Sequence, residues 1–171
     1  TLSFSEKGDV IILIGKSRND INSSEYLYSY CGVKLSPAPY FDIEEEKKIH
    51  ESIKCLIQRK MIKSAHDISE GGLFVCLIES ALQNDLGFEI TTDKTVREDA
   101  FLYGESQSRV IVSASENNLM QIKQILEKIN VEYNVLGRVT ERKIIIDNIE
   151  WGDIKEFKEL YDTSMEKFLG E

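Results

Sequence analysis

Residues 64–73 of the chain read SAHDISEGGL, and the apolar run LFVCLI extends from residue 73 to residue 78. The stretch passes from a short segment of strand character, across two glycines, into a nearly continuous apolar run. We therefore expect a strand at Ser64–Ile68 and a largely buried helix that starts at Gly71 and Gly72 and continues to about Gln83. A strand that turns directly into a buried helix is typical of an α/β fold.

The segments on either side of this stretch alternate in the same way. Asp42 opens the clearest helix, with Glu45 three residues later as a capping-box-like partner, and Ile49, Ile53, Leu56 and Ile57 define its buried face. Together, the predicted strands and helices indicate a single α/β domain in which helices pack on a mixed sheet. The other expected elements are strands at Val10–Ile14, Phe88–Thr91 and Arg109–Ala114, a hairpin of Tyr133–Val139 with Lys143–Ile146, and helices at Leu119–Ile129, at Asp153–Tyr161 and from Asp42 to about Met61.

Composition excludes several classes of function. The net charge of −9 disfavours nucleic acid and anionic membrane surfaces as partners, because both are negatively charged. The longest apolar runs are far too short to cross a bilayer. The three cysteines, Cys31, Cys55 and Cys76, are odd in number and lack CxxC spacing, which favours a reducing, cytoplasmic compartment. The chain begins with Thr1 rather than Met, which we interpret as a fragment or a processed product.

The turn at residues 66–72 is the first of two polar clusters. Free backbone N–H groups at a helix N-terminus attract anions, and glycines let a ligand approach the main chain closely. His66 and Asp67 bring an imidazole and a carboxylate to the same edge, and a Mg²⁺ ion would reconcile Glu70 with a bound phosphate. The pattern also fits a structural turn in which Asp67 or Ser69 caps the helix.

Residues 103–109 read YGESQSR and form the second cluster, directly before the strand at Val110. The side chains of Glu105, Ser106 and Gln107 would emerge at the mouth of a strand, where ligand groups are often held. An ordinary polar turn is the alternative. The sequence has no GxxxxGK[ST], GxGxxG, GxSxG or HExxH motif, so the residues alone identify neither a nucleophile nor a metal site.

Both clusters resemble hallmarks of the last domain of phosphoribosylformylglycinamidine synthase II. Residues 64–73 resemble its first hallmark, and residues 105–109, followed by a β-branched strand, resemble its second. The opening strand with Gly8, Asp9 and Gly15 also fits, as do Ser24–Leu27 and Gly137–Val139. The resemblance covers about residues 8–147 in order.

This resemblance implies a three-layer α/β/α sandwich with a mixed sheet, like the C-terminal domain of aminoimidazole ribonucleotide synthetase. Residues 1–171 would form one domain of a longer synthetase, with a core at about 8–147 and a C-terminal helical extension at 148–171. The family uses ATP and Mg²⁺ to condense formylglycinamide ribonucleotide, a small phosphorylated substrate, with ammonia from a glutaminase subunit or domain. The remaining domains of the synthetase would be its partners, and the fragment alone would be inactive.

The resemblance also implies a set of cleft residues, with Asp67 as a Mg²⁺ ligand. The family's catalytic histidine belongs to other domains, so no catalytic residue is assigned, and the cleft is either the active one or its structural counterpart. We expect the two clusters to converge on one edge of the sheet. The implied cleft residues are Ser24, His66, Asp67, Ser69, Glu70, Gly71, Gly72, Glu105, Ser106 and Gln107.

The chain departs from the family pattern in one loop. Relatives commonly carry Gly-Gly-Ser-Glu where this chain has Asn22-Ser23-Ser24-Glu25, so we expect the loop to lose a positive-φ turn and any phosphate-binding role that relied on it. The alternatives are another member of the same superfamily (aminoimidazole ribonucleotide synthetase, selenophosphate synthetase or thiamine-phosphate kinase) or a ligand-binding module without catalytic activity.

Overall fold

A seven-stranded mixed sheet forms the centre of the computed structural model, which describes residues 1–169. The strand order is β2-β4-β1-β5-β3-β6-β7, and all neighbours are antiparallel except the parallel pair β3 and β6. The strands are β1 (Val10–Ile14), β2 (Ser64–Asp67), β3 (Gly87–Ile90), β4 (Val110–Ala114), β5 (Tyr133–Thr140), β6 (Lys143–Ile146) and β7 (Ile149–Asp153).

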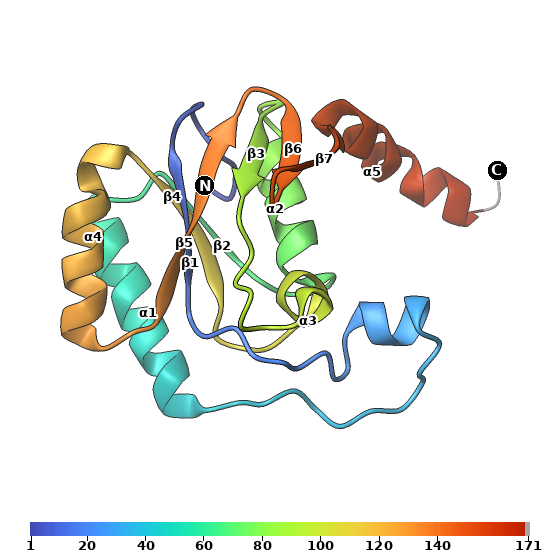
Figure 1. The fold of residues 1–171 in the computed structure, drawn as a ribbon, viewed down its shortest axis with the longest axis horizontal. Coiled ribbons are helices and arrows are strands. Elements are labelled where there is room, and N and C mark those ends of the chain that lie inside the picture. Colours follow the sequence, from blue (N-terminus) through green and yellow to red (C-terminus); the bar gives the residue numbers. More distant parts are fainter. Residues whose placement is uncertain (170–171) are drawn as a thin grey trace.

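Helices cover both faces of the sheet, which confirms the predicted three-layer α/β/α sandwich (Figure 1). Helices α1 (Ile43–Gln58) and α4 (Glu116–Ile129) lie on one face. Helices α2 (Gly72–Leu82) and α3 (Glu98–Tyr103) lie on the other, and α5 (Ile154–Leu169) packs against α2. A short π-helical turn, η1 (Tyr26–Tyr30), follows β1.

Strand β1 lies in the middle of the sheet and divides the core into two clusters. Ile11 and Leu13 join the cluster beneath α2 and α3, whereas Val10, Ile12 and Ile14 join the cluster beneath α1 and α4. All five side chains are buried. This is why the strand is a continuous apolar run rather than an alternating one.

Helix α1 begins as the sequence predicts. The carboxylate of Asp42 accepts hydrogen bonds from the backbone N–H groups of Glu44 and Glu45, at 2.8 and 3.1 Å. The helix ends at Gln58, three residues before the expected Met61. The expected buried face is wrong at Ile57, which is 54% exposed.

The predicted hairpin of β5 with β6 is wrong, because β3 lies between these two strands. The connection between β5 and β6 crosses the start of β3 at Gly87. A Cβ atom there would lie 2.5 Å from the carbonyl carbon of Arg142 and 2.6 Å from Thr140 Oγ1, so only glycine fits this crossing.

The hairpin that does form joins β6 to β7 through Asp147 and Asn148. Their φ angles of 52° and 65° are those of a two-residue type I′ turn. Burial raises the pKa of the Asp147 carboxyl, but hydrogen bonds from the Lys94 ammonium and from Thr92 outweigh it and hold the pKa below its ordinary value.

Two further differences from the sequence expectation concern short elements. No helix was expected at α3 (Glu98–Tyr103), and the segment 148–171, expected to be helical, starts with strand β7. Residues 170–171 of that segment lie outside the described residues. Within residues 1–169, no helix is both long enough and apolar enough to cross a membrane.

Candidate functional site

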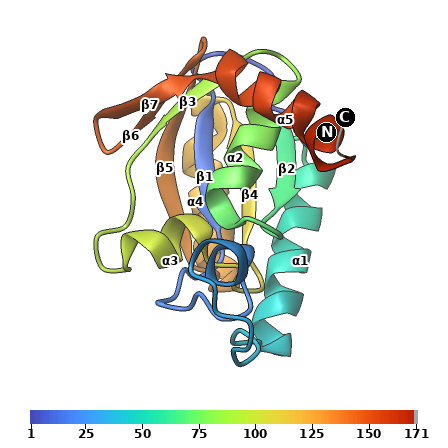
Figure 2. The same ribbon diagram turned by 90° about the vertical axis from the view of Figure 1, so that its right-hand side faces the viewer.

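One end of the sheet brings the two polar clusters together. Ile14, the last residue of β1, pairs with Val110, the first residue of β4, and Val110 also pairs with Asp67 at the end of β2. The loops 15–25, 67–72 and 104–109 therefore leave the sheet at the same end, beside α3 and the start of α2 (Figure 2). The expected convergence on one edge is present.

The carboxylate of Glu105 joins these loops. Its Oε1 atom accepts a hydrogen bond from the Gly71 N–H at 2.9 Å and another from the Glu25 N–H at 2.8 Å. Gly71 precedes the first turn of α2, and Glu25 precedes η1. A negative charge at the start of a helix is stabilised by the free N–H groups and by the helix dipole. The chain's own carboxylate thus occupies the position predicted for an external anion.

The two glycines of the first cluster shape this turn. Gly71 and Gly72 have φ angles of 81° and 73°, which L side chains rarely adopt. A Cβ atom at Gly72 would lie 2.7 to 2.8 Å from main-chain atoms of Leu102 and Tyr103. The close approach that Gly72 permits is therefore to the end of α3, within the chain itself.

Arg109 supports the second cluster from inside the molecule. The residue is buried, and its guanidinium donates to the carbonyl oxygens of Phe101, Gly104 and Ser106. Burial lowers the pKa of Arg109 to about 10, so the group remains protonated at neutral pH. A cation at these carbonyls also stabilises the C-terminal end of α3. Sequence reasoning did not assign this role, although an arginine directly before a buried strand was visible.

Ser24 is buried and its hydroxyl is already used. Ser24 Oγ donates to the Ile21 carbonyl at 2.6 Å and accepts from the Leu27 N–H at 3.2 Å, so the residue caps the turn of η1. The expectation that the loop loses its positive-φ turn is wrong, because Ser23 adopts a φ of 51°. Hydrogen bonds from Ser23 to Ser36 and Pro37 offset the strain of that conformation.

His66 and Asp67 lie on opposite faces of the edge strand β2, as the period of two in a strand requires. The His66 ring faces α2, where Nδ1 lies 3.1 Å from Ser80 Oγ and Nε2 lies 3.5 Å from Glu79 Oε2. Asp67 is exposed and borders a groove beside α1 that also contains Ile57. The two side chains therefore point to different sides of the strand, although both residues border this groove.

The remaining predicted residues differ in their access to solvent. Ser69, Glu70 and Gln107 are exposed around the Glu105 contact. Ser106 is 1% exposed, and its Oγ has no hydrogen-bond partner among the described residues. The groups available to a ligand at this edge are therefore Asp67, Ser69, Glu70 and Gln107.

These residues do not form a complete metal site. Within residues 1–169, no group of three or more His, Cys, Asp or Glu side chains is placed to hold a metal ion. Mg²⁺ is commonly bound through one or two carboxylates while phosphates and water supply the other ligands. The exposed Asp67 fits only that mode, as a single ligand.

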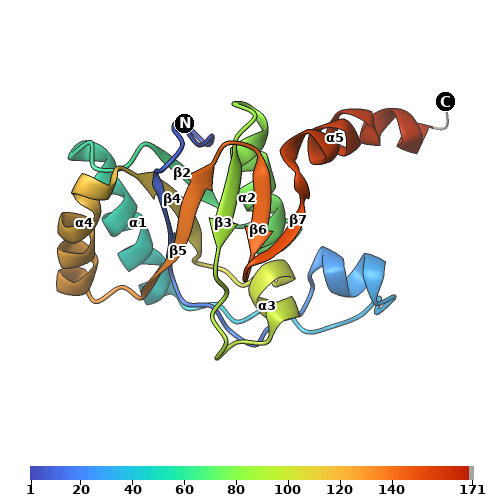
Figure 3. The ribbon, with the colours of Figure 1, turned by 45° about the horizontal axis from the view of Figure 1, so that its top comes forward.

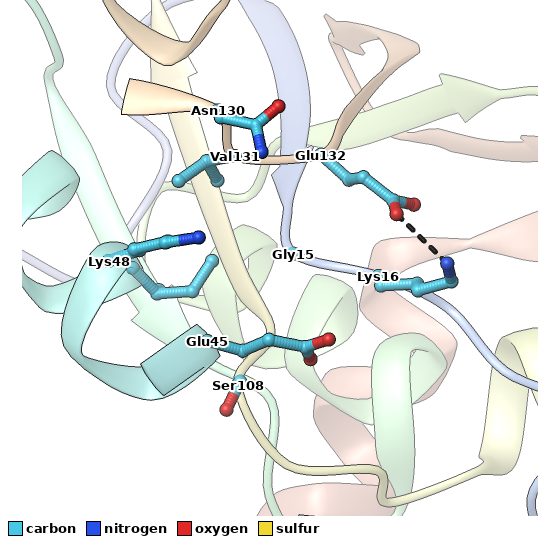
Figure 4. A pocket seen from close by; sticks show the side chains of 9 residues that line it. Gly15, Lys16, Glu45, Lys48, Ser108, Asn130, Val131 and Glu132 are labelled. Carbon is cyan, nitrogen blue, oxygen red and sulfur yellow. Dashed lines mark hydrogen bonds and ion pairs between the residues drawn. The ribbon is translucent and has the colours of Figure 1, made fainter. Parts of the chain in front are cut away.

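A separate pocket of about 190 Å³ lies on the α1 side of the sheet (Figure 4). Lys48 and Glu45 approach it from the first turns of α1, and Lys16 and Glu132, which form a 2.9 Å ion pair, border it from the loops. None of the predicted cleft residues lines this pocket, although Gly15 and Ser108 belong to stretches that resemble the family.

The sequence of the chain matches a known protein family. The family model described as "AIR synthase related protein, C-terminal domain" matches residues 6–148. The phosphoribosylformylglycinamidine synthase subunit PurL of Thermococcus sibiricus is 37% identical over 180 residues, covering 100% of this chain and 24% of that protein. The chain thus spans about a quarter of the length of this curated relative.

Solved structures share the fold. Thermotoga maritima PurL complexed with FGAR superposes with a TM-score of 0.77 and 20% identity, covering 91% of this chain and 29% of that one. The thiamine-monophosphate kinase of Stenotrophomonas maltophilia superposes with a TM-score of 0.59 and 15% identity, covering 86% of this chain and 52% of the kinase. At these identities the likeness shows the fold alone.

Proposed function

The chain belongs to the family of AIR synthase related proteins as their C-terminal domain, and from this membership we propose that it is the C-terminal domain of a phosphoribosylformylglycinamidine synthase. In this proposal the complete enzyme is an ATP-dependent ligase of purine biosynthesis. It converts formylglycinamide ribonucleotide and glutamine-derived ammonia to formylglycinamidine ribonucleotide. Residues 1–171 are one domain of that enzyme and do not catalyse the reaction alone.

Similarity in sequence and similarity in structure both support the proposal. The Thermococcus relative, at 37% identity, carries the name of this synthase. Solved PurL structures of the same fold are described as complexes with FGAR and with ATP. The thiamine-monophosphate kinase superposes less well, with a TM-score of 0.59 against 0.77, so the synthase is the better match.

The observation at the site that agrees with the proposal is the Glu105 carboxylate, which accepts hydrogen bonds from the Gly71 and Glu25 N–H groups and so holds three loops at one edge of the sheet. Glu105 acts as a positioning residue, because its Oε1 atom is engaged by the main chain. Asp67, Ser69, Glu70 and Gln107 are the exposed polar groups at that edge and would contact substrate or nucleotide. An amide such as that of Gln107 can both donate and accept hydrogen bonds.

The cofactors and partners follow from the same proposal. ATP would bind with Mg²⁺, for which Asp67 would supply one carboxylate ligand while the nucleotide phosphates supply others. The partners are the remaining domains of the synthetase and a glutaminase that delivers ammonia. We place the enzyme in the cytoplasm, where the free thiols of Cys31, Cys55 and Cys76 would stay reduced.

The test compares Asp67→Ala in two contexts, the 171-residue chain and the complete synthetase. Asp67 is exposed, so the free energy of unfolding of the 171-residue chain should change by less than about 0.5 kcal/mol. ATP turnover that depends on formylglycinamide ribonucleotide and ammonium should fall at least roughly tenfold in the complete synthetase, since the variant removes a charged ligand.

Thr163→Ala is the matched control, because Thr163 lies on α5 away from the proposed cleft. Turnover by the 171 residues alone would contradict the proposal. Equal activity of the wild-type synthetase and the Asp67→Ala variant would remove Asp67 from the site.

A further inference from the structure

An arm of the chain, residues 25–35, extends from the body on the same side as α5 (Figure 3). It contains η1 and the first residues of the extended segment before α1. Ser23 closes its base, since the Ser23 N–H donates to Ser36 Oγ at 2.7 Å and Ser23 Oγ donates to the Pro37 carbonyl at 2.9 Å. The arm is thus anchored at its base and projects from there.

The arm starts a band of aromatic side chains that crosses the outer surface of α3 and α2. The Tyr26 ring stacks between Tyr30, at 5.3 Å, and Tyr103, at 5.1 Å between ring centroids. Phe74 continues the band, at 5.9 Å from Tyr103 and 5.3 Å from Trp151. The rings are partly buried except Tyr30, which is 80% exposed.

The arm exposes several large apolar side chains. Leu35 is 91% exposed, and Tyr28 and Val33 are also exposed. Burying one such side chain contributes about 1.5–3 kcal/mol, so several of them exposed within eleven residues are typical of an interaction surface. Glu25 and Lys34 are its only charged residues and cancel, whereas the whole chain carries −9. The arm itself therefore suits an apolar, uncharged partner.

Relatives of this fold carry much additional chain. The match covers 52% of the thiamine-monophosphate kinase and 24% of the Thermococcus synthase, so each has at least about as much chain outside the fold as within it. A partner on the same polypeptide is held at high effective concentration, so a modest apolar surface is enough to bind it. Two separate copies would instead bring charges of −9 and −9 together.

We propose that the arm and the aromatic band form the docking surface for another domain of the same polypeptide, outside residues 1–171. This inference rests on the proposed function, which requires a longer synthetase. The docking domain presents an apolar face that accepts Tyr30 and Leu35. Docking fixes the arm and, through the Glu25 N–H bond to Glu105, the loop 104–109 at the proposed cleft.

The experiment is hydrogen–deuterium exchange of the backbone amides of residues 26–35, in the 171-residue chain and in the complete synthetase. We expect exchange to be at least roughly tenfold slower in the complete synthetase, since docking must then be broken before the amides open. The double variant Tyr30→Ser, Leu35→Ser should lose this protection. Met120→Ser is the matched control, because Met120 is 72% exposed on α4, on the opposite side of the sheet.

Each result decides the inference. Equal exchange rates in the two contexts, or retained protection in the double variant, would overturn it. Protection that appears in the 171-residue chain as its concentration rises would show that a second copy covers the surface instead. The readout needs no substrate, so it can fail while ligase activity is present, and a synthetase without ligase activity can still show docking.

Discussion

Glu105→Ala tests whether one carboxylate holds the site together. The variant removes the acceptor of the Gly71 and Glu25 N–H groups, at 2.9 and 2.8 Å. A hydrogen bond to a charged group contributes about 1.5–3 kcal/mol, and less where water can replace it. The hydrogen bond from Gly71 is partly buried and the one from Glu25 is exposed. We therefore expect the free energy of unfolding to fall by about 2 kcal/mol in total. For a chain of 171 residues, this corresponds to a fall in melting temperature of about 4–8 °C.

The assay is thermal and urea unfolding of the 171-residue chain, followed by circular dichroism. Glu105→Gln keeps an acceptor oxygen and loses only the charge at the helix N-terminus. Its free energy of unfolding should therefore fall by about 0.5–1 kcal/mol. Gln107→Ala is the matched control in the same loop and should stay within about 0.5 kcal/mol of wild type, because the side chain is exposed. The reasoning fails if Glu105→Ala is as stable as Gln107→Ala.

Three further variants test the surroundings of the site and the late hairpin. Gly72→Ala should lower the free energy of unfolding by more than about 2 kcal/mol, because its Cβ would meet main chain; Gly8→Ala has a similar φ with nothing within 4 Å and should lose about 1 kcal/mol in the same urea titration. Arg109→Met should lower the free energy of unfolding, measured with urea, by about 3 kcal/mol, because it leaves buried carbonyl groups without donors. A decrease below about 1 kcal/mol would contradict the supporting role of Arg109. Asp147→Asn should be less stable than wild type at neutral pH, and the difference should vanish once the pH falls below the folded pKa of Asp147. The folded pKa lies below the unfolded value of 3.8, so the carboxylate stabilises above that pH and this stabilisation is lost as the pH falls through the folded pKa; a pH-independent difference in melting temperature would refute it.

Elements with strong local signals were predictable from the sequence. The start of α1 needs only Asp42 and the two N–H groups within the next three residues, so its cap is visible in the sequence. The run Val10–Ile14 indicated a strand covered on both faces, and β1 is the middle strand with helices on both sides. The first prediction rests on interactions between neighbouring residues, and the second rests on an uninterrupted run of apolar residues.

Pairing over long distances in sequence was not predictable in the same way. β5 and β6 are adjacent in sequence, and adjacent strands usually pair, so a hairpin was the natural expectation. The chain instead places β3 between them, and the required small residue, Gly87, is about 55 residues away from that connection. The actual hairpin at Asp147 and Asn148 did carry a local signal, since these residue types tolerate positive φ, and it went unrecognised.

The site shows the same division between local and distant signals. The family resemblance identified both clusters, and their meeting at one edge agrees with it. The contact that joins them spans 34 residues in sequence from Gly71 to Glu105, and no periodicity indicates which carboxylate fills a helix N-terminus. The sequence also did not indicate which polar side chains of the cluster are buried, because Ser106 is buried while its neighbour Gln107 is exposed.

The internal use of Glu105 limits what the isolated chain can bind. The N-terminus of α2 is the natural anion site at this edge, and a carboxylate already occupies it. Asp67 and Glu70, which remain exposed there, carry the same sign of charge as a phosphate and would repel it. Arg109, the nearby cation in the second cluster, is buried behind the loop and engaged by carbonyl groups. The two cations of the loop 15–25 are also engaged, since Arg18 pairs with Glu45 at 2.7 Å and Lys16 pairs with Glu132 at 2.9 Å. We therefore expect phosphate binding at this edge to need further positive charge, such as a metal ion, and the isolated chain to bind ATP only weakly in a calorimetric titration.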